Sequence, residues 1–453
     1  MLDSAFDCLG IVVSQLGTLT FVLLIGGLVA SGLWIMMRIL KTSRLVRLFK
    51  QLNPTAPSSV QLRISPSPKF PVIANVAAQD PEMARKFFSA EHLVRWIPFI
   101  PKRSLFPSEG QEFLRHRRVV HAALRDEFLP LLNRLAQTSA THLVQTIDSL
   151  PNATLTDTYT FFHQQVARSI LLFCFGDKAH PDIIRFGLSV NMTGLVFNVF
   201  PRSFLRSIPI RSLRRKVALA DSFSEQTKIL LQRFRSDCPD VQKDTLFYLL
   251  FEANQAASGA LTDDELISNA LGFGIGGNDS TASALTSILF RLAEHPDIQE
   301  ELRVTPSTKL TQAVIKETLR LHPPFASGIS RFADQDICVG GVNIPKDMGV
   351  SIPIEQIQRC PAFWGDDAAE FRPSRHLASN AVNPAFMAWG FGKRACVGRG
   401  LAEKMISTCL THILASFKVQ FPPGQSASHV QFVSFRITAP RKPLQLSFIK
   451  NSN

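Results

Sequence analysis

A glycine-rich loop near the C-terminus contains a single cysteine. Residues 388–403 read AWGFGKRACVGRGLAE, with Cys396 among four glycines, beside Arg394, and directly before a segment with helical periodicity. Glycines let the backbone approach a flat cofactor, and backbone N–H groups can point at a sulfur ligand and tune its potential. Arg394 can pair with an acidic group of that cofactor. The loop therefore suits a metal-bound thiolate, with Cys396 as the ligand; a buried structural cysteine in a glycine-rich turn is the alternative.

A second segment combines glycines with helical periodicity. Residues 271–284 read LGFGIGGNDSTASA, in a predicted long helix that begins at Thr262, where Glu265 completes a capping box. Gly276 and Gly277 each destabilise a helix interior by about 1 kcal/mol relative to alanine. They need a reason, and close approach of a ligand is one. A helix–helix contact through small residues is the alternative.

An acid and two alcohols follow that glycine pair. Asp279 is succeeded directly by Ser280 and Thr281. A carboxyl group and a hydroxyl group side by side can pass protons to a reacting atom. These three residues are therefore candidate catalytic groups.

A charge pair lies on a third predicted helix. Residues 314–324 read VIKETLRLHPP, which places Glu317 and Arg320 three residues apart on one helical face, so that their side chains can meet. Such pairs are common on helices, so this pair alone does not indicate a function. It does so only in combination with the other two segments.

Together the three segments resemble the cytochrome P450 family. The haem-binding loop of that family reads Phe-Gly-x-Gly-x-Arg-x-Cys-x-Gly, and residues 389–398 match it in every place except the first, where Trp389 keeps the aromatic character. The family's Glu-x-x-Arg pair matches Glu317 and Arg320. Its Ala/Gly-Gly-x-Asp/Glu-Thr stretch matches residues 276–280, with serine in place of threonine.

The resemblance implies a haem b whose iron takes an axial thiolate from Cys396. In the family an aromatic residue or histidine lies four positions before an arginine that reaches a haem propionate, and Phe113 and Arg117 match this spacing, with His116 able to assist. Arg331 matches the family's second propionate arginine. The resulting cofactor-binding set is Cys396, Arg394, Arg117, Arg331, His116 and Trp389.

The resemblance also assigns the remaining candidates. The Glu317 and Arg320 pair is expected to lock onto Arg375, in a segment that reads FRPSR, and so to hold the haem loop as a buried charge triad. The acid and alcohols of the glycine-rich helix are expected to relay protons to iron-bound dioxygen, while the thiolate pushes electron density into its O–O bond. The catalytic set is Asp279, Ser280 and Thr281.

Composition is that of a globular protein with a membrane or acidic partner. The 453 residues are 45% hydrophobic and 19% charged, with a net charge of +13. The Lys and Arg residues are spread along the chain with only 2 Tyr and 4 Trp to interleave, so no nucleic acid partner is expected. The seven cysteines lack CxxC and any paired spacing, which predicts reduced thiols.

The N-terminus reads as a membrane anchor. Residues 1–15 are expected to be a short luminal tail, residues 16–37 a transmembrane helix, and residues 38–69 a basic and Pro/Ser-rich linker. Positive residues follow the apolar run, which predicts a single-pass protein of the endoplasmic reticulum membrane with a cytosolic catalytic domain over residues 70–453. That domain is predicted to be mainly α with small β-sheets, the cytochrome P450 fold.

The implied partners are NADPH-cytochrome P450 reductase, which passes on electrons from NADPH, and cytochrome b5. Five basic residues are candidates for the face that docks the reductase, although each equally suits a solvated surface. These residues are Arg115, Arg118, Lys393, Arg399 and Lys404. Expected substrate contacts lie in residues 271–275, 325–329 and 435–438.

The predicted activity is insertion of one atom of dioxygen into a lipophilic small molecule, in terpenoid or polyketide secondary metabolism of the fungal type. One alternative is a haem-thiolate isomerase or dehydratase that does not use dioxygen, against which Asp279 and Ser280 argue. The other is a non-catalytic membrane protein with a shortened fold.

Overall fold

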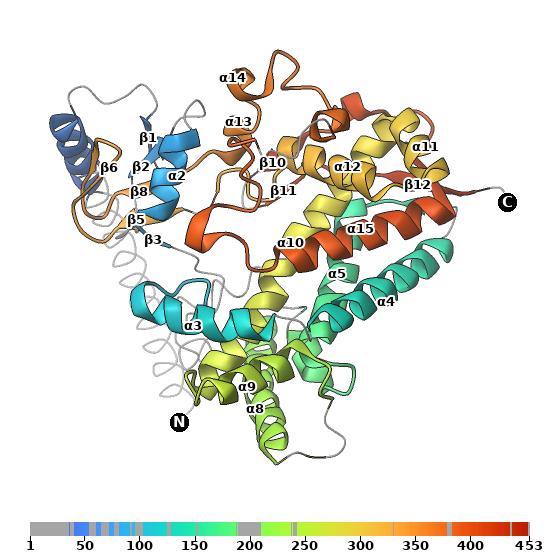
Figure 1. Ribbon diagram of the computed structural model, residues 1–453, viewed down its shortest axis with the longest axis horizontal. Helices are drawn as coiled ribbons and strands as arrows, with labels where there is room; N and C mark the ends of the chain where they lie inside the picture. The colour runs from blue at the N-terminus through green and yellow to red at the C-terminus, as the bar shows by residue number, and fades with distance from the viewer. Residues whose placement is uncertain are drawn as a thin grey trace, which may run out of the picture.

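The structure is a computed structural model that describes most of residues 36–451. The ranges left outside the description are 1–35, 37–39, 54–59, 65–71, 77–80, 91–92, 96–102, 125–127, 151–152, 187, 189–209, 237, 239–241, 329, 378–382, 435–436 and 452–453. Helices fill one side of the molecule, and a sheet with short flanking elements forms the other (Figure 1). The prediction of a mainly helical fold with small sheets is therefore confirmed.

The longest helix, α10 (Asp263–Glu294), runs through the centre of the helical side (Figure 1). Its 32 residues begin with the predicted capping box, in which Thr262 Oγ1 accepts from Glu265 N and Glu265 Oε2 accepts from Thr262 N at 2.8 Å. Most of its side chains are buried, because other helices pack around it. Helices packed along it include α5 (Thr158–Phe175), α8 (Arg211–Arg235), α9 (Leu246–Ala256), α11 (Pro296–Val304), α12 (Thr308–Leu321) and α15 (Arg399–Ser416).

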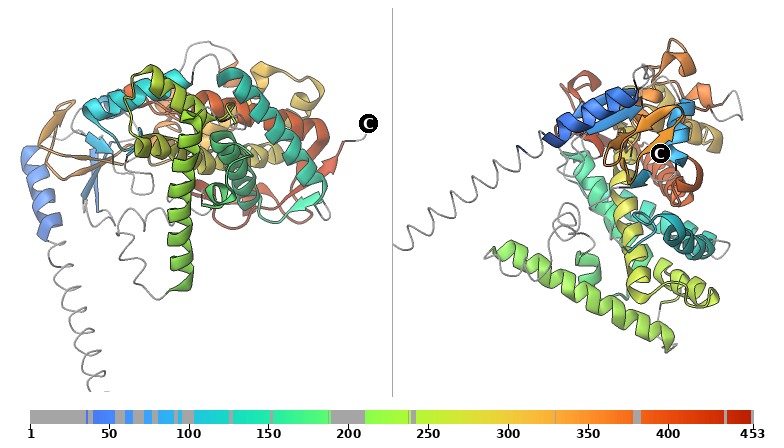
Figure 2. Two further views of the ribbon diagram at one scale, coloured as in Figure 1. Left: turned by 90° about the horizontal axis from the view of Figure 1, so that it is seen from below. Right: turned by 90° about the vertical axis from the view of Figure 1, so that its left-hand side faces the viewer.

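The main hydrophobic core lies between these helices and two more, α3 (Gly110–Ala123) and α4 (Phe128–Asp148). Helix α4 packs along α15. Helix α8 has fewer neighbours, and one end of it projects from the molecule (Figure 2).

A five-stranded sheet forms the second layer, in the order β1 (Val60–Ile64), β2 (Val72–Val76), β8 (Gly349–Ser351), β5 (Arg331–Ala333) and β3 (Leu93–Arg95). Strands β2 and β8 are parallel, and the other pairs are antiparallel. A separate hydrophobic cluster lies beside the sheet and includes side chains of α2 (Pro81–Ser89).

Smaller elements complete the described chain. They are the strands β4 (Thr154–Leu155), β6 (Ile337–Val339), β7 (Val342–Ile344), β9 (Phe417–Gln420), β10 (Phe432–Ser434), β11 (Thr438–Pro440) and β12 (Leu446–Lys450), the short helices α13 (Ile354–Ile357) and α14 (Pro361–Trp364), and the 3-10 turns η2 (Pro373–His376), η3 (Gly392–Arg394) and η4 (Ala427–His429).

The folded unit starts before residue 70, where the catalytic domain was expected to begin. A helix over residues 40–52 buries Leu45 and Phe49 in the cluster beside the sheet. Asn53 then donates to Asn343 O at 2.7 Å, and β1 pairs with β2. The predicted linker therefore contains folded elements, because its basic residues accompany an apolar helical stripe.

The predicted transmembrane helix, residues 16–37, lies outside the described residues except for Met36. Within the part of the chain that is described, no helix has the length and apolar character needed to cross a bilayer. The anchor therefore stays a prediction.

Thr262→Ala is expected to lower the free energy of unfolding by about 1 kcal/mol, because it removes the acceptor for Glu265 N at the start of α10. Denaturant unfolding measures the effect. Thr411→Ala is the control, since Thr411 lies on the exposed face of α15 and caps nothing. Equal shifts for the two variants would contradict the assigned N-cap.

Candidate active site

The loop before α15 presents Cys396 on an irregular backbone. Gly390 and Gly392 have φ values of +70° and +63°, a region that side-chain-bearing residues rarely adopt. Cys396 N donates to Trp389 O at 2.8 Å and closes the loop, and the cysteine is exposed. Helix α15 begins three residues later, so its N-terminal dipole favours a thiolate at this position.

Gly398 lies close to the sulfur. A Cβ atom added there would stand 4.0 Å from Cys396 Sγ. A cavity of about 160 Å³ borders this turn, and Val397, Gly398 and Leu401 contribute to its lining together with Phe273 of α10 and side chains of α4.

Arg394 lies against the start of α3. Its Nη2 donates to Ser108 O at 2.6 Å and forms an ion pair with Glu109, and its guanidinium carbon lies 3.4 Å from the centre of the Phe113 ring. Arg117, one turn further along α3, donates to Lys393 O at 2.5 Å. The loop arginine Arg394 and the α3 arginine Arg117 are therefore brought close together.

Arg331 of β5 belongs to the same group. Its side chain is buried, donates to Phe88 O at 2.8 Å, and lies over the Phe88 ring. Burial lowers its pKa to about 10, an effect that the charge of Glu109 opposes and that of Arg394 reinforces. It is still a cation at neutral pH. Arg394 pairs with the carboxylate of Glu109, Arg331 lies within reach of its charge, and Arg117 binds the backbone next to Arg394. This group of arginines suits a negatively charged ligand.

His116 lies elsewhere, in the contact between α3 and α10. Its ring is fully buried, and Asn269 Nδ2 lies 2.8 Å from its Nδ1. Because Asn269 Oδ1 accepts from Leu105 N, the amide orientation is fixed and Nδ1 must be the acceptor. Nε2 then carries the proton and faces Glu265 Oε1 at 3.4 Å. Burial lowers the pKa of His116, so the ring is neutral.

Glu265 is fixed by Arg115, whose guanidinium binds it through two hydrogen bonds of 2.8 and 2.5 Å. These bonds hold the pKa of Glu265 at about 2. Arg115, one of the residues expected on a reductase-docking face, therefore fastens α3 to the start of α10. Of the other four, Arg118, Lys393 and Arg399 are exposed and Lys404 is half-buried.

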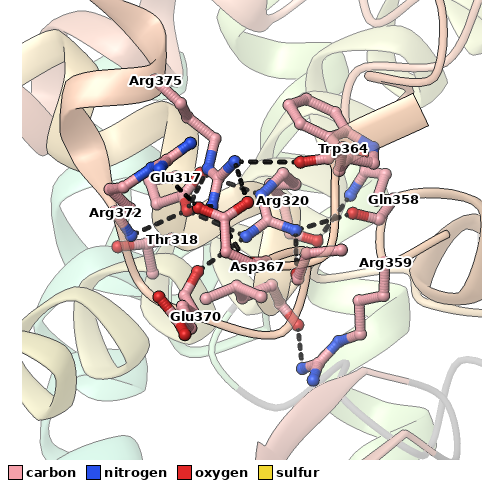
Figure 3. A network of polar contacts seen from close by, with 12 residues as sticks. Glu317, Thr318, Arg320, Gln358, Arg359, Trp364, Asp367, Glu370, Arg372 and Arg375 are labelled. Carbon is pink, nitrogen blue, oxygen red and sulfur yellow. Dashed lines mark hydrogen bonds and ion pairs between the residues drawn. The ribbon is translucent and has the colours of Figure 1, made fainter. Parts of the chain in front are cut away.

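The three residues of the predicted charge triad meet in a buried network (Figure 3). Arg320 donates to both carboxylate oxygens of Glu317, at 2.9 and 2.8 Å, and both side chains are fully buried. Arg375 Nε donates to Glu317 Oε1 at 2.9 Å. Two further donors, at 2.9 Å each, come from the backbone N–H of Arg372 and from His376 Nε2.

Gln358 connects this network to the cysteine loop. Its backbone carbonyl accepts from Arg320 Nη1 at 2.9 Å, and its side-chain Oε1 accepts from Met387 N at 2.7 Å. Met387 O in turn accepts from Gly390 N at 2.9 Å. A continuous chain of hydrogen bonds therefore leads from the buried ion pair to the first left-handed glycine of the loop.

The α10 segment places Asp279, Ser280 and Thr281 in three different environments. Ser280 Oγ donates to Gly276 O at 3.0 Å, and Thr281 is buried. Asp279 Oδ1 lies 2.7 Å from Nε2 of His163 on α5. The acid thus turns towards α5, while the serine hydroxyl stays against its own helix.

The glycines of this segment accommodate neighbouring side chains. A Cβ at Gly277 would stand 3.0 Å from Ile170 of α5, and one at Gly272 would stand 3.0 Å from the ring of Phe106. A Cβ at Gly276 would touch the same ring at 3.5 Å. The close approach expected at the glycines is therefore made by the protein itself, from α5 on one side and Phe106 on the other.

The family model described as Cytochrome P450 matches residues 30–448, which include every element of this site. The chain belongs to the cytochrome P450 family. Lithocholate 6-beta-hydroxylase of Mesocricetus auratus is 26% identical over 309 residues, 63% of this chain and 58% of the relative. Cytochrome P450 72A13 of Arabidopsis thaliana is 24% identical over 390 residues, 78% and 76% of the two chains.

A third relative, the mitochondrial 25-hydroxyvitamin D-1 alpha hydroxylase of Rattus norvegicus, is 35% identical over 204 residues, 41% of this chain and 40% of the relative. This chain spans 58% of the length of the hamster hydroxylase and 65% of that of cytochrome P450 734A5 of Oryza sativa. A solved zebra fish cytochrome P450 with abiraterone has the same fold, with a TM-score of 0.66 and 19% identity, over 90% of this chain and 99% of that one.

A cytochrome P450 binds haem through a thiolate, and the donor set of this P450 fits that group. The exposed thiol of Cys396 sits on a glycine backbone that can approach a flat ring. Arg394 and Arg331 near Glu109, together with Arg117 at the backbone of Lys393, supply the positive charge that two propionates require. The individual haem contacts of Cys396, Arg394, Arg117, Arg331, Trp389 and His116 stay predictions.

Several residues of this P450 site carry no signal in the sequence. Gln358, His163 and Phe106 are ordinary residue types in unremarkable segments, and only the fold brings them to the site. His376 carried a weak signal, because it follows the triad arginine directly. The expected substrate contacts at Ile329 and at residues 435–436 lie outside the described chain.

Arg320→Leu is expected to lower the free energy of unfolding by about 3–5 kcal/mol, because it leaves Glu317 buried without its main partner. Arg303→Leu is the matched control. Arg303 pairs with Glu300 at the same spacing on a helix surface, where loss of an exposed pair changes the free energy of unfolding much less. Denaturant unfolding compares the two, and similar losses would show that the Glu317 network does not stabilise the fold.

Acid is expected to weaken the fold through Glu317. Burial opposes its ionisation, but the hydrogen bonds from Arg320 and His376 prevail and hold its pKa at about 2, below the ordinary value of 4.5. Because the folded-state pKa is depressed, this stabilisation is complete above about pH 4.5 and is lost as the pH falls towards 2. Unfolding midpoints between pH 6 and pH 3 should decline less steeply in Glu317→Gln than in the wild type; equal slopes would exclude this origin.

Proposed function

We propose that this P450 is a haem-thiolate monooxygenase that inserts one atom of dioxygen into a lipophilic small molecule. The observation that carries the proposal is the loop of Cys396, held by hydrogen bonds to the buried Glu317 network and flanked by clustered arginines. When bound, haem supplies the activation of dioxygen with electrons from a partner. Positioning of the cofactor and movement of protons are carried out by residues of the chain.

Positioning of the cofactor falls to two groups of residues. Cys396 would hold the iron, and Arg117, Arg331 and Arg394 would hold the propionates as charge-assisted hydrogen-bond donors. The Glu317 network fixes the backbone that carries the cysteine, because Gln358 links it to Met387 in the loop. A shift of the loop would misplace the thiolate.

Proton movement falls to α10. Asp279 is a carboxyl group within reach of a second titratable residue, and Ser280 has a hydroxyl hydrogen-bonded to Gly276 O. An acid next to an alcohol favours the monooxygenase over a haem-thiolate isomerase or dehydratase, which needs no protons for oxygen reduction. Thr281 is a further, buried hydroxyl.

The substrate is proposed to be a lipophilic molecule of terpenoid or polyketide type, as in fungal secondary metabolism. Support comes from the apolar side chains of α10 near Gly276, among them Phe273, and from relatives that are named hydroxylases of lithocholate and of 25-hydroxyvitamin D. Phe106 belongs with the expected contacts, because its ring lies on the glycine face of α10.

The electron donor is proposed to be NADPH-cytochrome P450 reductase, with cytochrome b5 as a second partner. The exposed Arg118, Lys393 and Arg399 support docking of an acidic surface near the cysteine loop. The protein is proposed to be anchored in the endoplasmic reticulum membrane by residues 16–37, with the catalytic domain in the cytosol. The uncharged apolar run and the basic residues after it support this topology.

The carbon monoxide difference spectrum of the dithionite-reduced protein tests the proposal. The wild type in microsomes is expected to give the red-shifted band of a thiolate-bound haem, and Cys396→Ala is expected to lose it, because no other thiol lies on the loop. Cys338→Ser is the control, since Cys338 is exposed on β6 and should leave the band unchanged. Folded wild-type protein without a haem band would contradict the proposed enzyme and favour a non-catalytic role.

A further inference from the structure

The acid of α10 contacts a histidine on the neighbouring helix α5. Nε2 of His163 lies 2.7 Å from Asp279 Oδ1, and the two side chains are 14% and 19% exposed. The helices approach closely here, because Gly277 leaves room for Ile170 of α5. The pair therefore lies between the buried middle of α10 and the solvent.

A third residue shapes the chemistry of this contact. Asn278 Nδ2 lies 3.0 Å from the same Nε2 of His163. When Nε2 carries a proton, it donates to the Asp279 carboxylate. When that proton has moved to Asp279, Nε2 has a lone pair that accepts from the Asn278 amide. The geometry thus provides a partner for each of the two positions of one proton.

We propose that His163 is the residue that supplies protons to Asp279, an inference that rests on the monooxygenase function proposed above. In this step the Nε2–H bond of the imidazolium breaks and an O–H bond forms on Asp279 Oδ1. The imidazole is left neutral and takes up a proton from solvent, to which it is partly exposed. Histidine suits this task because its ring can both release and accept a proton, whereas the side chains of arginine and lysine have no acceptor atom.

A proton relay and a purely positioning role differ in which residues can replace His163. A glutamine at residue 163 can still donate a hydrogen bond to the Asp279 carboxylate, but it cannot carry a proton between solvent and Asp279. A purely positioning role would therefore tolerate His163→Gln, and a relay would not. His163→Phe removes both functions.

The experiment measures NADPH-driven oxygen consumption by the haem-loaded protein with its reductase, which requires no knowledge of the substrate. His163→Phe and His163→Gln are both expected to be slower than the wild type by about 10-fold or more, within the range of general acid–base effects. The double variant with Asp279→Asn should be no slower than Asp279→Asn alone. His142→Gln, an exposed histidine on α4, is the control and should match the wild type.

The infrared C–O stretch of the carbon monoxide complex gives a second readout that does not depend on turnover. His163→Phe is expected to shift this band, because Asp279 loses its partner, whereas His163→Gln should keep the wild-type frequency. A His163→Gln oxygen-consumption rate equal to the wild type, a double variant slower than Asp279→Asn, or an unshifted band in His163→Phe would each overturn the relay. If the wild type lacks the thiolate carbonyl band, the proposed function fails and the relay fails with it; a normal band with unaffected variants overturns the relay alone.

Discussion

The ion pair between Glu317 and Arg320 is the constraint on which the rest of the site depends. Both side chains are fully buried, and moving two charges out of water is costly unless every remaining donor and acceptor is used. Here the carboxylate receives five hydrogen bonds in all, from Arg320, Arg375, His376 and the N–H of Arg372. The guanidinium also donates to the carbonyls of Gln358, Ala368 and Glu370.

These hydrogen bonds connect three segments that are far apart in the sequence at one buried ion pair. Helix α12 carries the pair, and residues 358–376 wrap around it (Figure 3). Gln358 connects this network to Met387, next to the cysteine loop. The buried pair is therefore less a source of stability than a means of fixing one backbone arrangement, a use of buried charge that fits the position of Cys396 at the end of the chain of contacts.

The sequence predicted the parts of this site whose residue types are costly anywhere else. A cysteine between glycines, a glycine pair inside a helix and a Glu-x-x-Arg pair each need a structural reason, and the predicted triad does meet. The capping box of α10 was also predictable, because it is local. Gln358, Phe106 and His163 were not, because each is an ordinary residue that acts only through contacts across tens to hundreds of positions.

Two expectations were made without knowledge of where a side chain points. His116 was grouped with the propionate arginines by its position next to Arg117, but adjacent residues on a helix point in different directions, and His116 faces Asn269 on α10. The linker assigned to residues 38–69 was judged by composition, which does not reveal that Leu45 and Phe49 share one buried face. In both cases the direction in which a side chain points, and not its residue type, determines its contacts.

Phe106 and the glycines of α10 together determine the volume available near the active site. The Phe106 ring rests on Gly272 and approaches the Cβ position of Gly276. Any side chain added to that face of α10 must therefore be matched by a smaller residue at position 106. Conversely, a smaller residue at position 106 opens space only while the two glycines remain. Efforts to redesign substrate preference therefore need to vary position 106 and the two glycines as one unit, since libraries that change them separately would sample mostly overpacked or hollow sites.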